Sequence, residues 1–518
     1  MNLLEIIIFL LLCAVALGWI ARRAGLPYPI ALVVGGGALG FVPKLPQLEF
    51  DPQHLLVLVL PPILYQAALL TSWRDFKANL RQIGLLAIGL VIVTTLTVGA
   101  ALKFLIPDIP WAVAFVLGAI VSPPDAVAAT AILSKLNMPR RIVTVLEGES
   151  LVNDASGLVL YKFAVAAVLS GAFSLFDATV QFVLVSIGGI AVGMLLAGLF
   201  VAIHRFLGDP FIEVLLSLAV PYIAYVGAES VHVSGVLAVV AAGLLRGRYS
   251  PQMVSAEMRI LARSVWNILV FILVSLIFIL IGVQLSEVIG RLEGYTGWDL
   301  ASYSLGVSMV AILVRFAWVY FAEYLPTWLG RLTRREVPPP LPGEAFIVGW
   351  CGMRGIVSLA AALALPTQVS GEPFPYRDLI IFLSFVVILV TLLVQGLTLA
   401  PLIRRLKLGS DHSARDELRL ARQSMGKAAL AAIEGVCAEV SMLPEVIERI
   451  RTEFNERMAA ASPLAQMSDS SHAHATRMRI AAVRAERHEL IRLWQAGEVG
   501  DEVLHRLEEE LDYEESRL

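Results

Sequence analysis

The chain contains the sequence Val121-Ser122-Pro123-Pro124-Asp125-Ala126-Val127, in the middle of an apolar block at residues 110–134. Two consecutive prolines remove two backbone N–H donors and disfavour helical geometry at the residue before them. We therefore expect a helix that breaks in mid-block, beside a carboxylate. Carbonyls freed inside a bilayer persist only where protein, water or an ion satisfies them. The stretch predicts a cation site of carbonyl and carboxylate oxygens, and the alternative is a packed proline kink with Asp125 as a local cap.

The composition around this stretch indicates a polytopic membrane protein. Of 518 residues, 58% are hydrophobic and only 16% are charged, whereas soluble chains are nearer a quarter charged. Apolar blocks of about 20 residues, long enough to cross a hydrocarbon core of roughly 30 Å, fill most of residues 1–403. Residues 404–518 hold 38 charged side chains and show helical apolar spacing. We expect an all-α membrane domain at 1–403 and a helical soluble tail at 404–518. The net charge of −3 gives no reason to expect a nucleic-acid partner.

Thirteen transmembrane spans are predicted, each an apolar block bounded by proline, glycine or charged residues. They lie near residues 3–20, 28–42, 54–71, 83–104, 110–134, 142–170, 178–203, 211–228, 233–245, 265–289, 298–324, 343–365 and 379–403. The loops after odd-numbered spans hold 16 Lys and Arg, and the loops after even-numbered spans hold 4. Basic loops face the cytoplasm, so we expect the N-terminus outside and the tail in the cytoplasm. The first span has no basic segment before it and no small-residue cleavage site, so we expect it to be retained.

A second polar stretch lies in the sixth predicted span. It reads Glu147-Gly148-Glu149-Ser150-Leu151-Val152-Asn153-Asp154. Four residues separate Ser150 from Asp154, so the two side chains share a helical face. Oxygen ligands from Asp154, Ser150 and Asp125 suit a hard cation such as sodium better than soft thiolates would. The carboxylates of this span also favour a basic partner, and Arg315 and Arg354 are the arginines placed within predicted spans.

A third stretch lies in the twelfth predicted span. It reads Gly349-Trp350-Cys351-Gly352-Met353-Arg354-Gly355. Three glycines around an arginine weaken the helix and permit close backbone approach, which predicts a second broken helix. If spans 1–6 and 8–13 form two halves, the broken spans 5 and 12 take equivalent positions. Their offset of seven spans is odd, so the halves run in opposite senses, as in transporters built from inverted repeats.

These three stretches together resemble the signature segments of the sodium/proton exchanger family, in the branch of cation:proton antiporters that carries an Asn-Asp pair in span 6. The resemblance covers spans 3–13 in the same order. It implies that Asp154 carries the cation and the proton, and that Asp125, Ser150 and Asn153 line the site. It also implies an ion pair between Glu149 and Arg315, to which we add Arg354, together with a homodimer and an elevator-like movement.

The chain departs from the family pattern at two positions. Many relatives place an acidic residue after the span 3 prolines, where this chain has Tyr65-Gln66-Ala67. An accessory carboxylate is therefore missing. Many relatives also have a polar residue beside the span 5 aspartate, where this chain has Pro124. We expect the Pro124 carbonyl or a water molecule to supply a ligand there.

From these residues we expect a secondary transporter of the cell membrane that serves pH and sodium homeostasis. Na⁺ (or Li⁺ or K⁺) competes with H⁺ for Asp154, and one titrating carrier predicts electroneutral one-for-one exchange; the alternative is that Asp125 also titrates, which would make the protons two. No cofactor is expected. A cation channel and a potassium-preferring antiporter are the alternatives. An enzyme is not expected because the sequence holds no Gly-x-Ser-x-Gly elbow, zinc motif or P-loop.

Other charged residues have weaker expectations. Lys162 is expected near a span end with its amine reaching the interface. His204 and His232 are expected at the interface, with pH sensing as the alternative. The tail is expected to be solvated, packing on itself or on its dimer mate, with regulation of transport as the alternative.

Overall fold

The structure of the chain is a computed structural model, and it divides into two compact units, Met1–Ser410 and Asp411–Leu518. It describes residues 3–25, 27–42, 52–133, 136, 138–171, 174–204, 206–253, 256–292, 294–332, 342–369, 371–406, 412–439, 444–459 and 469–496, and single residues near the C-terminus. The boundary expected at 403/404 falls inside the last helix of the first unit.

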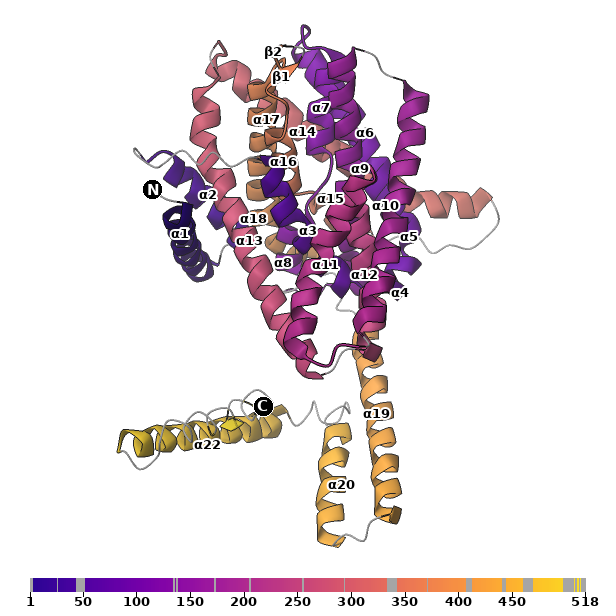
Figure 1. Ribbon diagram of the computed structural model, residues 1–518, viewed down its shortest axis with the longest axis vertical. Coiled ribbons are helices and arrows are strands. Elements are labelled where there is room, and N and C mark those ends of the chain that lie inside the picture. The colour runs from indigo at the N-terminus through magenta and orange to yellow at the C-terminus, as the bar shows by residue number, and fades with distance from the viewer. Residues whose placement is uncertain are drawn as a thin grey trace. The chain divides into compact units, whose positions relative to one another are not determined.

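The first unit is built from helices, with one two-stranded hairpin (Figure 1). The helices are α1 (Leu3–Ala24), α2 (Tyr28–Gly40), α3 (Pro52–Leu70), α4 (Trp73–Ala78), α5 (Leu80–Gly84), the π-helix η1 (Leu85–Leu90), α6 (Val91–Leu105), α7 (Trp111–Val121), α8 (Ala126–Leu133), α9 (Arg140–Ser170), α10 (Leu175–His204), α11 (Pro210–Ser230), α12 (Gly235–Met253), α13 (Ala256–Gly290), α14 (Gly297–Leu332), α15 (Pro342–Trp350), α16 (Ile356–Leu363), α17 (Arg377–Val390), the π-helix η2 (Thr391–Gln395) and α18 (Gly396–Leu406). Strands β1 (Gln368–Val369) and β2 (Glu372–Pro373) pair antiparallel.

Seven helices in the described part of the chain are long and apolar enough to cross a membrane. They are Leu80–Leu105, Arg140–Ser170, Phe176–His204, Pro210–Ser230, Met258–Gly290, Gly297–Leu325 and Arg377–Leu406. Three shorter apolar helices are Tyr28–Gly40, Val57–Leu70 and Trp111–Val121. Helices suit such segments because every interior backbone group is satisfied within the segment itself.

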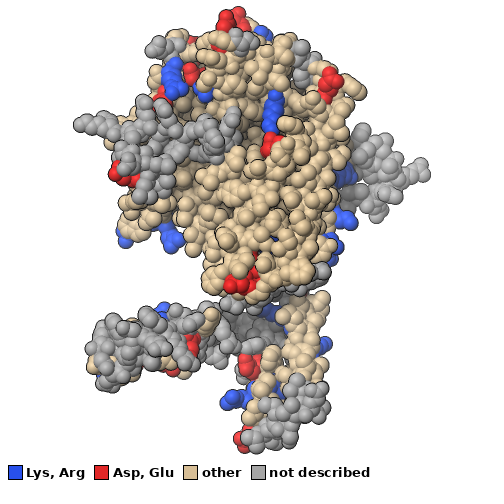
Figure 2. All heavy atoms as spheres, viewed as in Figure 1, with Lys and Arg blue, Asp and Glu red and all other residues tan. Residues whose placement is uncertain are grey.

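The outer surface of this unit is largely apolar. Large hydrophobic side chains such as Phe104, Trp298 and Phe206 are more than four-fifths exposed. In Figure 2, uncharged residues cover most of the middle of one face, and charged residues lie mainly toward its two ends. An exposed apolar surface of this extent is typical of a protein that contacts lipid.

Two helical runs are interrupted where the sequence carries proline and glycine. The run from Trp111 stops at Val121 and resumes at Ala126, across the two prolines. The run from Pro342 stops at Trp350 and resumes at Ile356. The two non-helical segments touch, because the Asp125 backbone N–H donates to the Met353 carbonyl at 2.7 Å. The approach is close enough to require glycine at 355, where an added Cβ would overlap the Asp125 carboxylate.

Buried apolar side chains hold the helices together in three clusters. The largest contains Leu32 of α2, Phe278 of α13 and Ile347 of α15. Helices α2 and α13 pack backbone against backbone: a Cβ added at Gly36 would overlap the Ile279 carbonyl. Small residues at a crossing bring helices this close in membranes, where van der Waals packing drives association.

The second unit contains three helices in the described residues, α19 (His412–Glu439), α20 (Pro444–Ala459) and α22 (Asp469–Gln495). Helices α19 and α20 lie side by side (Figure 1), and Arg451 pairs with Glu434 at 3.9 Å. Many of the described side chains of α19 and α20 are exposed, so this pair is a largely solvated helical hairpin.

Candidate cation-binding site

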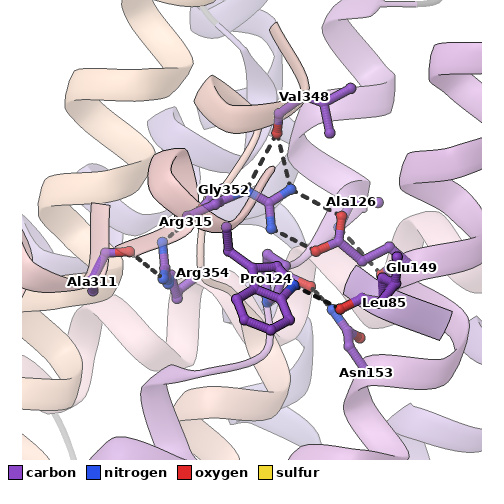
Figure 3. A network of polar contacts seen from close by, with 12 residues as sticks. Leu85, Pro124, Ala126, Glu149, Asn153, Ala311, Arg315, Val348, Gly352 and Arg354 are labelled. Carbon is purple, nitrogen blue, oxygen red and sulfur yellow. Dashed lines mark hydrogen bonds and ion pairs between the residues drawn. The ribbon is translucent and has the colours of Figure 1, made fainter. Parts of the chain in front are cut away.

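Helix α9 passes beside the break between α7 and α8 and bonds to its free backbone groups (Figure 3). The Asn153 side-chain amide donates to the Pro124 carbonyl at 2.8 Å. The Ser150 hydroxyl accepts from the Ala126 backbone N–H at 3.3 Å. Proline cannot continue a helix, and so two side chains of α9 take over groups that a continuous helix would have satisfied internally.

Asp125 connects both breaks. One of its carboxylate oxygens accepts from the Val127 backbone N–H at 2.8 Å, in the first turn of α8. The other accepts from the Ile356 backbone N–H at 3.4 Å, at the start of α16. Asp125 therefore caps the N-terminal ends of both α8 and α16. The cap on α8 is the local cap that the sequence predicts as an alternative. Each carboxylate oxygen has more than one acceptor position, so capping leaves capacity for a cation.

Asp154 is the buried carboxylate of the site that has no partner. Its side chain is 6% exposed, and it makes no hydrogen bond or ion pair with any residue that the structure describes. The adjacent Asn153 Oδ1 is likewise buried and has no partner among the described residues. A buried, uncompensated carboxylate is costly, so Asp154 needs either a proton or a bound cation. The nearby oxygens of Asp125, Ser150 and Asn153 are the hard ligands that such a cation prefers.

Glu149 and Arg315 form a bidentate ion pair, with N–O distances of 2.5 and 2.9 Å. Both side chains are 1% exposed. The same guanidinium donates twice to the Val348 carbonyl, at 3.0 and 3.3 Å. The charges of Glu149 and Arg315 therefore compensate each other, and Glu149 is not free to bind a transported cation.

Arg354 does not join the ion pair of Glu149 and Arg315, where we expect it from the sequence. It has no carboxylate within ion-pair distance among the described residues. Instead its guanidinium donates to three backbone carbonyls, those of Val121 (3.1 Å), Ala311 (3.1 Å) and Gly352 (2.5 Å) (Figure 3). Val121 is the last residue of α7, whose carbonyl end carries the negative pole of the helix dipole. Arg354 thus stabilises one helix end at the crossing while Asp125 stabilises two helix starts.

Two polar residues of the last predicted span, Thr391 and Gln395, were not identified from the sequence. The Thr391 hydroxyl accepts from the Arg354 backbone N–H at 3.1 Å. Gln395 is fully buried, and neither side-chain amide atom has a partner in the described structure. Both residues lie on η2, and π-helical turns are frequent at functional sites. The available signal was a pair of polar residues four apart in an otherwise apolar block.

Among the described residues, Lys162, His204 and His232 make no hydrogen bond or ion pair with the residues of this cluster. Lys162 is mostly exposed and pairs with Glu229 at 3.2 Å. His204 is the last residue of α10; it is 4% exposed, and its Nε2 lies 3.4 Å from a Glu213 carboxylate oxygen. Glu213 lies in the first turn of α11, so the short connection brings the two side chains together. His232 is exposed, as an interfacial residue would be.

The chain is similar to known proteins over most of its length. The family model described as "Sodium/hydrogen exchanger, transmembrane" matches residues 7–405. A protein of Mycobacterium tuberculosis (strain ATCC 25618 / H37Rv), described as an uncharacterized Na⁺/H⁺ exchanger, is 35% identical over 528 residues, covering 99% of this chain and 96% of that protein.

Two further similarities concern a second relative and a solved structure. The sodium, potassium, lithium and rubidium/H⁺ antiporter of Bacillus subtilis (strain 168) is 32% identical over 519 residues, covering 97% of this chain and 76% of that protein. The structure of the sodium proton antiporter MjNhaP1 from Methanocaldococcus jannaschii at pH 8 aligns with a TM-score of 0.63 and 19% identity, covering 79% of this chain and all of that one. At that identity the alignment shows a shared fold.

Proposed function

The chain belongs to the sodium/hydrogen exchanger family, whose members are cation/proton antiporters, and from this premise we propose that it exchanges Na⁺ for H⁺ at Asp154. The observation that carries the proposal is the Asp154 carboxylate, 6% exposed and without a partner among the described residues. Asp125, Ser150, Asn153 and the Pro124 carbonyl supply the further oxygens around it.

Exchange follows from competition for one carboxylate. Desolvation disfavours the charged form of a buried acid, so a proton binds Asp154 readily and a cation must displace it. The protonated and the cation-loaded forms are both compensated and can cross between the two sides of the membrane. The empty, charged form costs several kcal/mol more than a compensated form, so it does not cross, and transport in one direction requires transport in the other.

The stoichiometry that we propose is one Na⁺ for one H⁺. Glu149 is compensated by Arg315, and Asp125 caps α8 and α16, which leaves Asp154 as the single carrier. Exchange at equal rates across a range of membrane potentials in proteoliposomes would support electroneutral transport. A steep dependence of the rate on voltage would contradict it, and would assign the second titrating group to Asp125.

The finer architecture belongs to the same proposal. We infer thirteen transmembrane spans with inverted repeats and the N-terminus outside, and a cytoplasmic helical tail beyond residue 403. The protein then works as a homodimer in the cell membrane, and moves its core by an elevator-like shift. The contacts between the two interrupted helices support the elevator-like shift, because they connect the residues of the site so that these residues can move together.

Two alternatives are distinguished by simple measurements. A broader antiporter, which accepts K⁺ as well as Na⁺, is favoured by the Bacillus subtilis relative, which is described as a sodium, potassium, lithium and rubidium/H⁺ antiporter. A series of Na⁺, Li⁺, K⁺ and Rb⁺ gradients, each with a pH-sensitive dye inside vesicles, separates these cases. A cation channel would instead carry current without moving protons.

The direct test replaces the proposed carrier. Asp154→Asn keeps the size of the side chain and removes its charge, so we expect cation-driven proton flux to fall to the level of empty vesicles. Asp177→Asn is the matched control, because Asp177 is exposed at the start of α10, and we expect its flux to equal that of the parent protein. Sustained flux in a folded Asp154→Asn variant would exclude Asp154 as the carrier.

A further inference from the structure

A cavity lined in part by arginines lies between helices α3, α11, α12 and α13, outside the cation site. Its volume is about 290 Å³. Three of its lining side chains are arginines: Arg246 near the end of α12, and Arg259 and Arg263 near the start of α13. No acidic side chain lines the cavity in the part of the chain that the structure describes. The described lining of the cavity therefore carries three positive charges and no negative one.

Arg246 is the most informative of the three. It is 6% exposed, yet it makes no hydrogen bond or ion pair with any described residue. The other two arginines that are buried as deeply, Arg315 and Arg354, each bond to several protein oxygens. A buried charge without a partner is costly, and a guanidinium has five N–H donors to satisfy. No described protein group compensates Arg246, and the cavity beside it has room for an anion.

The neutral wall of the cavity supports this conclusion. Gln66 on α3 is uncharged, and its side-chain amide donates to the Asn267 side-chain oxygen at 3.0 Å. Across the cavity, the Trp266 indole N–H donates to the Ser217 hydroxyl at 3.1 Å. These polar side chains bond to one another and supply no negative charge to Arg246.

We propose that this cavity binds a phosphate-bearing anion, with Arg246 as its main donor and the exposed Arg259 and Arg263 completing the site. A planar guanidinium matches two phosphate oxygens at once, which gives a stronger and more specific contact than an ammonium would. Basic pockets between transmembrane helices take anionic lipid headgroups, and free inorganic phosphate offers the same chemistry. The site goes beyond cation exchange and is independent of Asp154.

The test measures thermal unfolding of the full-length, delipidated protein in neutral detergent. One arm adds inorganic phosphate against chloride at equal ionic strength, and the other adds phosphatidylglycerol against phosphatidylcholine. We expect phosphate or phosphatidylglycerol to raise the unfolding temperature of the parent protein. Arg246→Gln should weaken the apparent affinity about tenfold or more, since a charge-assisted hydrogen bond is lost. Arg248→Gln is the matched control: it removes the same charge from the same helix but lies outside this cavity.

The outcomes distinguish a free anion from a lipid headgroup as the ligand, and some of them would refute the proposal. A response to phosphate alone identifies a free anion, and a response to phosphatidylglycerol alone identifies a lipid headgroup. No response of the parent protein to either would overturn the proposal, as would equal responses of Arg246→Gln and Arg248→Gln. Arg263→Gln changes an exposed residue and therefore preserves folding. If Arg246→Gln does not fold, an unchanged response of Arg263→Gln overturns the proposal.

Discussion

The buried ion pair between Glu149 and Arg315 predicts an asymmetric loss of stability. Removing one partner of a buried pair costs about 3–5 kcal/mol, because the other charge is left uncompensated. Glu149→Gln leaves the Arg315 guanidinium its two hydrogen bonds to the Val348 carbonyl, so we expect a loss near the lower value. Arg315→Gln leaves Glu149 without any partner among the described residues, and we expect a loss near the upper value.

The double variant provides the decisive comparison. With both charges removed, no uncompensated group remains, so the loss should be smaller than the sum of the two single losses by at least about 1 kcal/mol. Unfolding can be followed by tryptophan fluorescence during titration with a denaturing detergent, since the chain has 9 tryptophans. Glu147→Gln, a half-buried acid on the same helix, is the control and should cost less than about 1 kcal/mol. Additive losses, or single losses as small as that of the control, would refute the reasoning.

Two further predictions concern a glycine contact and a surface pair. Gly355→Ala places a Cβ onto the Asp125 carboxylate, so we expect loss of proton flux in the vesicle assay. Gly198→Ala, with nothing within 4 Å of the added Cβ, should retain full flux, and normal flux in both variants would contradict the described crossing. Lys162→Gln breaks the exposed pair with Glu229, which should change the free energy of unfolding by less than about 1 kcal/mol; a loss of several kcal/mol would show that this pair is buried in the working protein.

The sequence predicts those features of the fold that arise from local chemistry. Span lengths follow from the hydrocarbon thickness, and Pro123 and Pro124 place an interruption where they stand because proline cannot donate a backbone hydrogen bond. Four-residue spacing puts Ser150 and Asp154 on one face of α9. Each of these inferences uses residues within a few positions of one another.

Partners that lie far apart in the sequence are harder to predict. Arg354 could have paired with any intramembrane carboxylate, and the pattern gave no reason to choose the Val121 carbonyl, 233 residues away. Every residue has a backbone carbonyl, so a residue pattern does not indicate which carbonyl a side chain will bond. Thr391 is overlooked for a related reason, since a single hydroxyl in an apolar span commonly bonds its own helix. The burial of His204 likewise depends on residues distant from it, since it follows from how α10 and α11 pack.

The hydrogen bond between Arg354 and Val121 also constrains how the protein is made. At about 5–20 residues per second, the ribosome needs roughly 10–50 s to synthesise the chain between the two partners. During that interval the carbonyl end of α7 has no guanidinium, and the Asp125 backbone N–H has no Met353 carbonyl. The N-terminal half must therefore pass through a state in which water or the insertion machinery occupies these groups. Assembly of the candidate cation-binding site is thus a late step of biogenesis, completed only after Arg354, more than four-fifths of the way along the first unit, has left the ribosome.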